Sequence, residues 1–253
     1  MSGRLLKGWR PLVVLILFFF IWEIVVKKAG IDAWLLPAPS KIIQEGIASW
    51  TSFSVHLLST IKLGTTGFFI GITIGLLTAA ILYLIPVIRE SVYPLLILSQ
   101  NVPVIVLAPL LVIWFGFGML PKIIVITLVC FFPVTVAALD GFKQTAPDLK
   151  HYMRMAGATR GQLFWKLELP HALPSIFSGL KISATYSIMG AVISEWLGAK
   201  AGLGVYMTLA SSAFRTDRVF VAIFAIMFLS LLFFGIIILI EKLLVRWQSK
   251  GAK

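Results

Sequence analysis

Long apolar stretches separated by short polar segments dominate the chain. A bilayer core about 30 Å thick needs roughly 20 mostly apolar residues to be crossed by a helix, and six stretches approach that length. They are Pro11–Val26, Gly64–Leu84, Val92–Trp114, Pro121–Leu139, Leu173–Leu197 and Val219–Ile240. The pattern predicts an all-α, polytopic membrane protein with about six transmembrane helices.

Composition supports this class and excludes others. Of the 253 residues, 59% are hydrophobic and 13% are charged, whereas a typical soluble chain is about 25% charged. The mean hydropathy is +1.00. These values exclude a soluble fold, a disordered chain and a disulfide-stapled secreted module. The single cysteine, Cys130, lies in an apolar run, so we expect it to face lipid or the protein core.

The first apolar stretch could be a signal peptide, because Arg4, Lys7 and Arg10 precede it. However, Glu23–Lys28 lacks the small-x-small pattern of a cleavage site. We therefore expect an uncleaved anchor, and for Glu23 we expect a position at the interface or a structural ion pair.

The charge of +12 comes from 22 Lys and Arg against 10 Asp and Glu. In a soluble protein it would indicate nucleic acid, but in a membrane protein it records orientation, since cytoplasmic loops are enriched in Lys and Arg. Six spans place both termini on one side, and that side holds more of the basic residues. We expect both termini in the cytoplasm of a bacterial-type plasma (inner) membrane, and no nucleic-acid partner.

The spans divide the chain into a predicted N-terminal helix with an external amphipathic segment (1–63), a core (64–245) with a cytoplasmic loop (140–172), and a cytoplasmic tail (246–253). In the external segment Ser40 is predicted to cap a short helix that runs to Trp50. Four apolar side chains of this segment are expected on the membrane surface: Ile42, Ile43, Ile47 and Trp50.

Glycines four residues apart mark the second span, at Gly67, Gly71 and Gly75. Such a stripe lets another helix approach closely, so we assign these residues to helix packing.

The third span contains polar residues beside a proline. Pro103 should kink or unwind the helix, and broken helices at membrane depth are tolerated only against protein or a water-filled cavity. Gln100, Asn101 and Pro103 are therefore candidates for the substrate pathway, with interhelical hydrogen bonding as an equal alternative.

Glu195 ends the fifth span, which is the most polar of the six. An acid at membrane depth usually faces the protein interior. Contact with substrate, pairing with a basic residue and a position at the interface all remain open for Glu195.

Candidate chemistry is sparse. His56, His151 and His171 are scattered, and no metal-ligand spacing, phosphate-binding loop or nucleophile elbow occurs in the sequence. We therefore expect no catalytic residue and no metal or other cofactor bound by this chain. If ATP drives transport, the ATPase is another polypeptide.

The inner loop is the most charged part of the chain and predicts a short helix, a glycine break at Gly157, a second amphipathic helix, and re-entry into the membrane marked by Pro170 and Pro174. Ala156, Gly157 and Ala158 form a narrow knob suited to docking into a groove of a partner.

Here the sequence resembles the membrane-spanning subunit of a type I, binding-protein-dependent ABC importer (MetI-like architecture). The cytoplasmic signature of that family is Glu-Ala-Ala, three residues, Gly, nine residues, Ile, one residue, Leu-Pro. Gly157, Leu167, Leu169 and Pro170 fall in register, whereas His151-Tyr152-Met153 replaces the Glu-Ala-Ala start. The acidic contact of the family is thus not carried over to this chain.

The resemblance implies a homodimer of permease subunits, two cytoplasmic ABC ATPase subunits that use ATP, and an external solute-binding protein. It also implies that Arg154, Ala156, Gly157, Ala158, Leu167, Leu169 and Pro170 couple the permease to the ATPase. The resemblance extends to the subgroup for sulfonates, taurine and nitrate. Within that subgroup, Gly204–Met207 and Phe214–Phe220 are most similar to permeases for thiamine-precursor pyrimidines.

The chain is thus interpreted as a non-enzymatic permease for a small polar solute. The competing interpretation is an ion-coupled secondary transporter, for which Glu195 would be the coupling acid.

Overall fold

The computed structural model describes residues 5–245, and the expected tail 246–253 lies outside them. The described chain is built from helices. Their bounds are α1 (Leu5–Lys28), α2 (Pro39–Ala48), α3 (Trp50–Leu84), α4 (Pro86–Gln100), α5 (Val104–Phe115), α6 (Met119–Lys143), α7 (Pro147–Met155), α8 (Arg160–Leu163), α9 (Leu169–Glu195), α10 (Leu203–Ser212) and α11 (Thr216–Leu244). A π-helical turn, Phe164–Glu168, joins α8 to α9.

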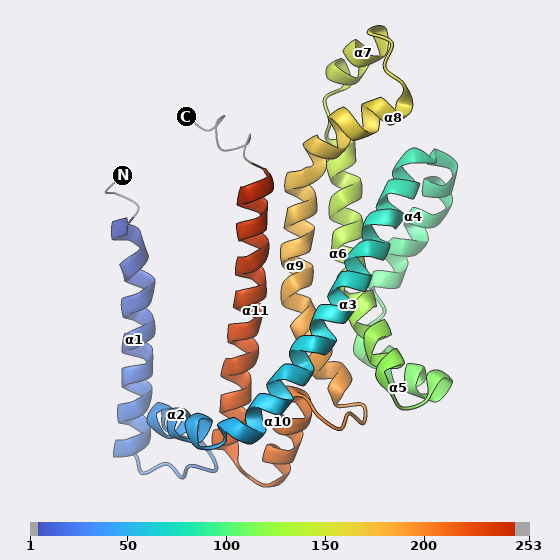
Figure 1. The fold of residues 1–253 in the computed structure, drawn as a ribbon. Helices are drawn as coiled ribbons and strands as arrows, with labels where there is room; N and C mark the ends of the chain where they lie inside the picture. The colour runs from blue at the N-terminus through green and yellow to red at the C-terminus, as the bar shows by residue number, and fades with distance from the viewer. Residues whose placement is uncertain (1–4, 246–253) are drawn as a thin grey trace.

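The two ends of the bundle carry different elements (Figure 1). The start of α1, the end of α11 and the protruding α7 and α8 lie at one end, here called the α7 end; α2 and α10 lie at the other, the α10 end. Within residues 5–245, five helices are long and apolar enough to span a membrane, and the bent pair α4–α5 supplies a sixth. Since α3 ends at the α7 end and α6 starts at the α10 end, this pair crosses the bundle. The expectation of about six spans is confirmed.

The core consists of α3, α6 and α9, and glycines set its close helix contacts. A Cβ atom on Gly67 would lie 2.5 Å from Ile126, and one on Gly71 would lie 2.8 Å from Cys130. On the other side of α6, a Cβ atom on Gly179 would lie 2.8 Å from the carbonyl oxygen of Pro133. The stripe on α3 is therefore in contact with α6, as the spacing of its glycines indicates.

Hydroxyl groups tie these three helices together. The Oγ of Ser183 on α9 donates to the carbonyl of Cys130 at 2.8 Å, and the Oγ1 of Thr135 on α6 donates to that of Gly75 at 3.2 Å. Cys130 is fully buried, so it faces the core rather than lipid. These hydrogen bonds require helix backbones that lie close together, because Ser and Thr side chains are short.

The third span breaks where expected, at Pro103. The axes of α4 and α5 differ by 99° across this point, and Val102 donates to the carbonyl of Ser99 instead of continuing the α-helical pattern. Pro94 and Pro109 cause no such break, since both lie inside helices. A transmembrane helix tolerates the single hydrogen bond that each proline removes.

Two expectations about the external segment are wrong. Ser40 does not cap α2, because Pro39 takes the first helical position and Ala38 becomes the cap residue. Ile42 does not face the membrane, because it is 3% exposed and lies one turn before Gly46, which packs on Val221 of α11. The other three apolar side chains, Ile43, Ile47 and Trp50, are exposed as expected.

Several span boundaries also differ from the predicted ones. The helix predicted from Gly64 already begins at Trp50. The predicted re-entry at Pro170 and Pro174 is no boundary, since one helical segment runs from Arg160 to Glu195. The carbonyl that Pro170 would clash with belongs to Lys166, which lies in the π-helical turn, where the wider turn relieves the contact. The loop Gly198–Arg218 contains a helix that the sequence did not predict, α10.

Helix α1 stands apart from the core (Figure 1) and is held by polar and aromatic contacts. Glu23 forms an ion pair with Lys27 at 2.7 Å and accepts hydrogen bonds from the backbone and hydroxyl of Ser40. Trp22 packs on Phe220 of α11. Glu23 therefore has the structural pairing that was expected.

Candidate functional site

The segment at the tip of the α7 end, residues 147–168, is a helical hairpin with a glycine at its turn. Gly157 has a φ of +81°, in the left-handed region that favours glycine. The backbone N–H of Ala158 donates to the carbonyl of Met153 at 3.0 Å and so caps the C-terminal end of α7. Thr159 then starts α8 through a reciprocal capping box with Gln162. We call residues 147–168 the α7–α8 hairpin.

One face of this hairpin is free in the isolated chain. Helix α7 has no buried residue among those described, and its Tyr152 and Met155 are about 70% exposed, at 68% and 71%. Arg154 and Ala156 are also exposed, whereas Leu163 and Phe164 are buried against the bundle. The hairpin therefore presents small, aromatic and basic side chains beyond the end of the bundle.

A partly buried polar cluster ties the hairpin to the spans. Lys150 on α7 forms an ion pair with Glu168 at 3.1 Å and donates to the hydroxyl of Tyr83 at 2.9 Å. Tyr83, near the end of α3, donates to the same Glu168 oxygen at 2.6 Å. We call these three residues the Lys150 cluster. It joins α3, α7 and the π-helical turn that leads into α9.

Electrostatics and packing both favour this arrangement. Burial lowers the pKa of Lys150, but its hydrogen bonds with Tyr83 and Glu168 outweigh burial and set the net pKa above its ordinary value. The ring of Tyr83 packs against Phe142 at 5.2 Å, and Phe142 packs against Phe164 at 5.3 Å. The charged groups thus sit on an apolar base, where an unpaired partner would be costly.

A groove lies beside the break in the third span. It has a volume of about 460 Å³ and lies between the α4–α5 pair, α6 and α9. Its lining residues are Gln100, Val104, Val129, Phe132, Pro133, Val136, Ala137, Ile182 and Tyr186. We call it the Gln100 groove. An amide and a phenol are its polar side chains, and no lining residue carries a formal charge.

Glu195 is buried at the α10 end, with 1% of its surface exposed. Its carboxylate accepts from the hydroxyl of Thr60 at 2.7 Å and from the backbone N–H of Gly204 at 2.8 Å. The Nδ1 atom of His56 accepts a hydrogen bond from the backbone N–H of Gly202 at 3.1 Å. These contacts fasten the connection between α9 and α10 to α3.

With this geometry in place, comparison with known proteins identifies the family. A family model described as "Binding-protein-dependent transport system inner membrane component" matches residues 71–246. The chain belongs to this family. It is the permease subunit of an ATP-binding-cassette importer, which works with ATPase subunits and an external binding protein.

Similar proteins along nearly the whole permease carry related descriptions. The formylaminopyrimidine transport permease ThiX of Halalkalibacterium halodurans is 36% identical over 98% of this chain and 99% of its own length. The riboflavin permease RibX of Chloroflexus aurantiacus is 30% identical over 94% and 89%. The taurine permease TauC of Escherichia coli is 28% identical over 91% and 86%.

A solved structure shows the same fold. The crystal structure of an amino acid ABC transporter with histidines has a TM-score of 0.60 and 19% identity, covering 81% of this chain and 97% of the other. The all-α, MetI-like architecture is thereby confirmed. Because the chain belongs to a family of ABC importer permeases, the competing interpretation as an ion-coupled secondary transporter is rejected.

The structure brings together some of the permease residues predicted from the sequence. Of the coupling residues, Arg154, Ala156, Gly157 and Ala158 lie on the α7–α8 hairpin, and Leu167, Leu169 and Pro170 lie where it joins α9. Gln100 lines its groove, whereas Asn101 is exposed and bonds to the carbonyl of Ile97 at the end of its own helix. Glu195 lies in a separate place, fastening the α10 end.

Sequence reasoning missed the Lys150 cluster. Its members are far apart in the sequence, at Tyr83, Lys150 and Glu168, and each alone resembles an ordinary polar residue near a membrane interface. The available signal was Glu168, an acid between two leucines in a segment expected to re-enter the membrane.

Proposed function

We propose that this permease imports a small, uncharged heteroaromatic compound of the aminopyrimidine class and works as a two-fold symmetric homodimer. In this proposal the α7 end, with both termini, faces the cytoplasm, where each α7–α8 hairpin docks on an ATPase subunit. The α10 end faces outward and receives the external binding protein. The chemistry of the Gln100 groove carries the substrate part of the proposal.

The groove suits a planar heteroaromatic ring. Phe132 and Tyr186 offer aromatic surface, and the amide of Gln100 offers both a donor and an acceptor, which a pyrimidine ring with an amino group can use together. A sulfonate would enter this groove with a full negative charge, and burying a charge without a partner is costly. The absence of a charged lining residue therefore favours the pyrimidine class over taurine and other sulfonates. The 36% identity with a formylaminopyrimidine permease supports the same choice.

The open side of the groove supports the proposed two-fold closure. The helices α5 and α9, which contribute to its lining, also carry exposed apolar side chains, at Val106, Ile113 and Met189. A second copy placed against this face would enclose a path between identical grooves, and closed two-fold symmetry is the commonest arrangement of identical subunits.

Coupling to ATP hydrolysis is assigned to the α7–α8 hairpin and the Lys150 cluster. The hairpin offers an exposed docking face at the same end as the start of α1 and the end of α11. The excess of Lys and Arg at this end supports its cytoplasmic position. When the ATPase subunits close, movement of α7 reaches α3 and α9 through the Lys150 cluster, because this cluster joins all three.

Transport assays test the substrate class. The permease is reconstituted with its ATPase and binding protein in proteoliposomes, and ATP-dependent uptake of radiolabelled formylaminopyrimidine, riboflavin and taurine is measured. We expect uptake of the pyrimidine, and at least tenfold less uptake with Gln100→Leu, a loss of about 1.4 kcal/mol. As control, Asn101→Leu removes a neighbouring amide that does not line the groove and should leave uptake within about twofold. Preferential uptake of taurine would refute the assignment.

A further inference from the structure

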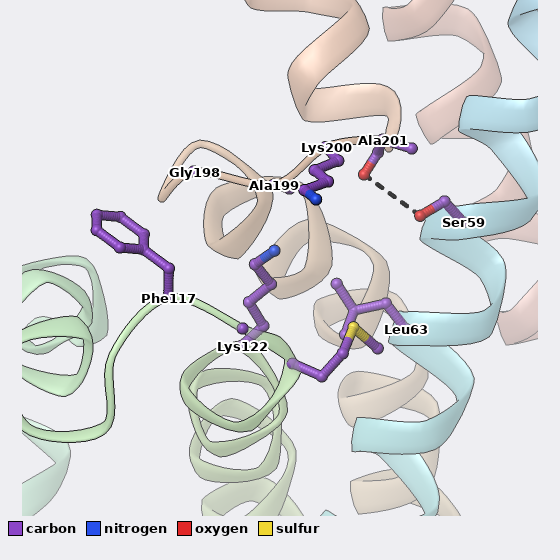
Figure 2. A pocket seen from close by; sticks show the side chains of 10 residues that line it. Ser59, Leu63, Phe117, Lys122, Gly198, Ala199, Lys200 and Ala201 are labelled. Carbon is purple, nitrogen blue, oxygen red and sulfur yellow. Dashed lines mark hydrogen bonds between the residues drawn. The ribbon is translucent and has the colours of Figure 1, made fainter.

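A second pocket, distinct from the Gln100 groove, lies at the α10 end (Figure 2). It has a volume of about 360 Å³ and lies between α3, the α5–α6 connection and the α9–α10 connection. Lys122 and Lys200 supply its charge, and Figure 2 shows both side chains among the residues that line it. We call it the lysine pocket.

Lys122 lies in an electrostatically unfavourable position. It is 7% exposed, and within residues 5–245 its ammonium forms no ion pair and no hydrogen bond. It also sits in the first turns of α6, where the helix dipole disfavours a cation. The carboxylate of Glu195 is near enough for its charge to act on Lys122, but both of its oxygens accept hydrogen bonds from Thr60 and Gly204. The charge of Glu195 therefore compensates that of Lys122 only in part and without a direct contact.

The walls of the pocket are fixed before any ligand arrives. Ser59 on α3 donates to the carbonyl of Ala201 at 3.3 Å (Figure 2), and the neighbouring Gly202 is held by His56. Phe117 and Leu63 add apolar surface beside the two ammonium groups. A rigid site with two cations and an apolar wall fits a carboxylate on a short aliphatic stem.

We propose that the lysine pocket binds one carboxylate, an aspartate or glutamate side chain of the external binding protein. This inference rests on the proposed function, which places the α10 end outside. The occupant follows from location and chemistry: the pocket is at the end that receives the binding protein, and its two ammonium groups complement a carboxylate. An ion pair with the docked protein would give the Lys122 ammonium a direct partner only in the complex, so the pocket favours the docked state.

Docking measurements test this proposal. The permease–ATPase complex is placed in nanodiscs of uncharged lipid, which removes anionic headgroups, and the Kd of the binding protein that supports uptake is measured at low and high salt. We expect Lys122→Met and Lys200→Gln each to raise the Kd about tenfold and to weaken its salt dependence. Lys122→Arg should keep most of the affinity. Lys62→Gln, a lysine on α3 that does not line the pocket, should leave the Kd unchanged.

Thermal unfolding of the nanodisc complex without binding protein shows whether Lys122 acts in docking or only in the stability of the permease. Lys122→Met should leave the unfolding midpoint close to that of the wild type, because Lys122 makes no direct ion pair or hydrogen bond within residues 5–245. A lower midpoint would assign Lys122 to folding and overturn the proposal, as would unchanged docking by the two lysine variants. If the wild-type permease does not dock any binding protein, the proposed function fails instead.

Discussion

At the scale of single residues, the α10 end is organised around one carboxylate. Glu195 occupies the space that a side chain at position 202 would need, since a Cβ atom on Gly202 would lie 2.1 Å from its carboxyl carbon. Gly202 also has a φ of +138°, which L residues rarely adopt. Glycine is therefore required at this position for two independent reasons, and the acid and the glycine form one unit.

Replacing Gly202 with alanine should destabilise the permease by about 2–4 kcal/mol, from steric overlap plus backbone strain. The unfolding midpoint in detergent measures this. Gly235→Ala on α11 is the matched control, because a Cβ atom there meets nothing within 4 Å, and it should change stability little. Equal midpoints for the two variants would contradict this prediction, because they would show that the α9–α10 connection accommodates a side chain at position 202 at little cost in stability.

At the scale of elements, α7 is an outlying helix with a single anchoring side chain. None of its described residues is buried, yet Lys150 reaches Glu168 and Tyr83 at the base of the hairpin. Such an arrangement can move as a lever, because the tip is free and the contact near the spans is stiff. The π-helical turn at Phe164–Glu168 lies at the junction, a place where extra width in a helix often accompanies function.

Lys150→Met should uncouple transport from ATP hydrolysis. ATP-dependent uptake should fall about tenfold while ATPase activity and co-purification of the ATPase persist, because the docking face of α7 is intact and only its link to α3 and α9 is lost. Lys166→Met, an exposed lysine in the same hairpin, is the control and should leave coupling intact.

Exchanging the charges of Lys150 and Glu168 tests whether Lys150 links α7 to the spans or only stabilises the fold. The double variant Lys150→Glu with Glu168→Lys restores an ion pair with the two charges exchanged. It should recover part of the uptake that each single change removes. Loss of ATPase binding in Lys150→Met, or no recovery in the double variant, would contradict the lever.

At the scale of the whole molecule, the proposed homodimer would make the described chain half of a transport path. The Gln100 groove is open on one side and bordered by exposed apolar residues. Helix α1, by contrast, stands on the opposite side of the bundle, next to α11, and its exposed apolar side chains suit lipid.

Cross-linking tests which face meets the second copy. Gln100→Cys should form cross-linked dimers with a short thiol-reactive linker, whereas Leu231→Cys on the exposed face of α11 should stay monomeric on denaturing gels. The native Cys130 is buried and needs no replacement. Cross-linking through α11 but not through position 100 would place the two-fold axis elsewhere.

Hydrophobic patterning alone determined the membrane class and the approximate spans, because these depend on local composition. Single residues predicted the break at Pro103 and the close packing of the α3 glycines. The register around Gly157 likewise identified the family. Tertiary structure decided what unites distant residues: Tyr83 with Lys150 and Glu168, Thr60 with Glu195, and Lys122 with Lys200. Polar residues far apart in the sequence have no local pattern that names their partners, and only the folded arrangement of the helices decides which charges are paired and which remain open.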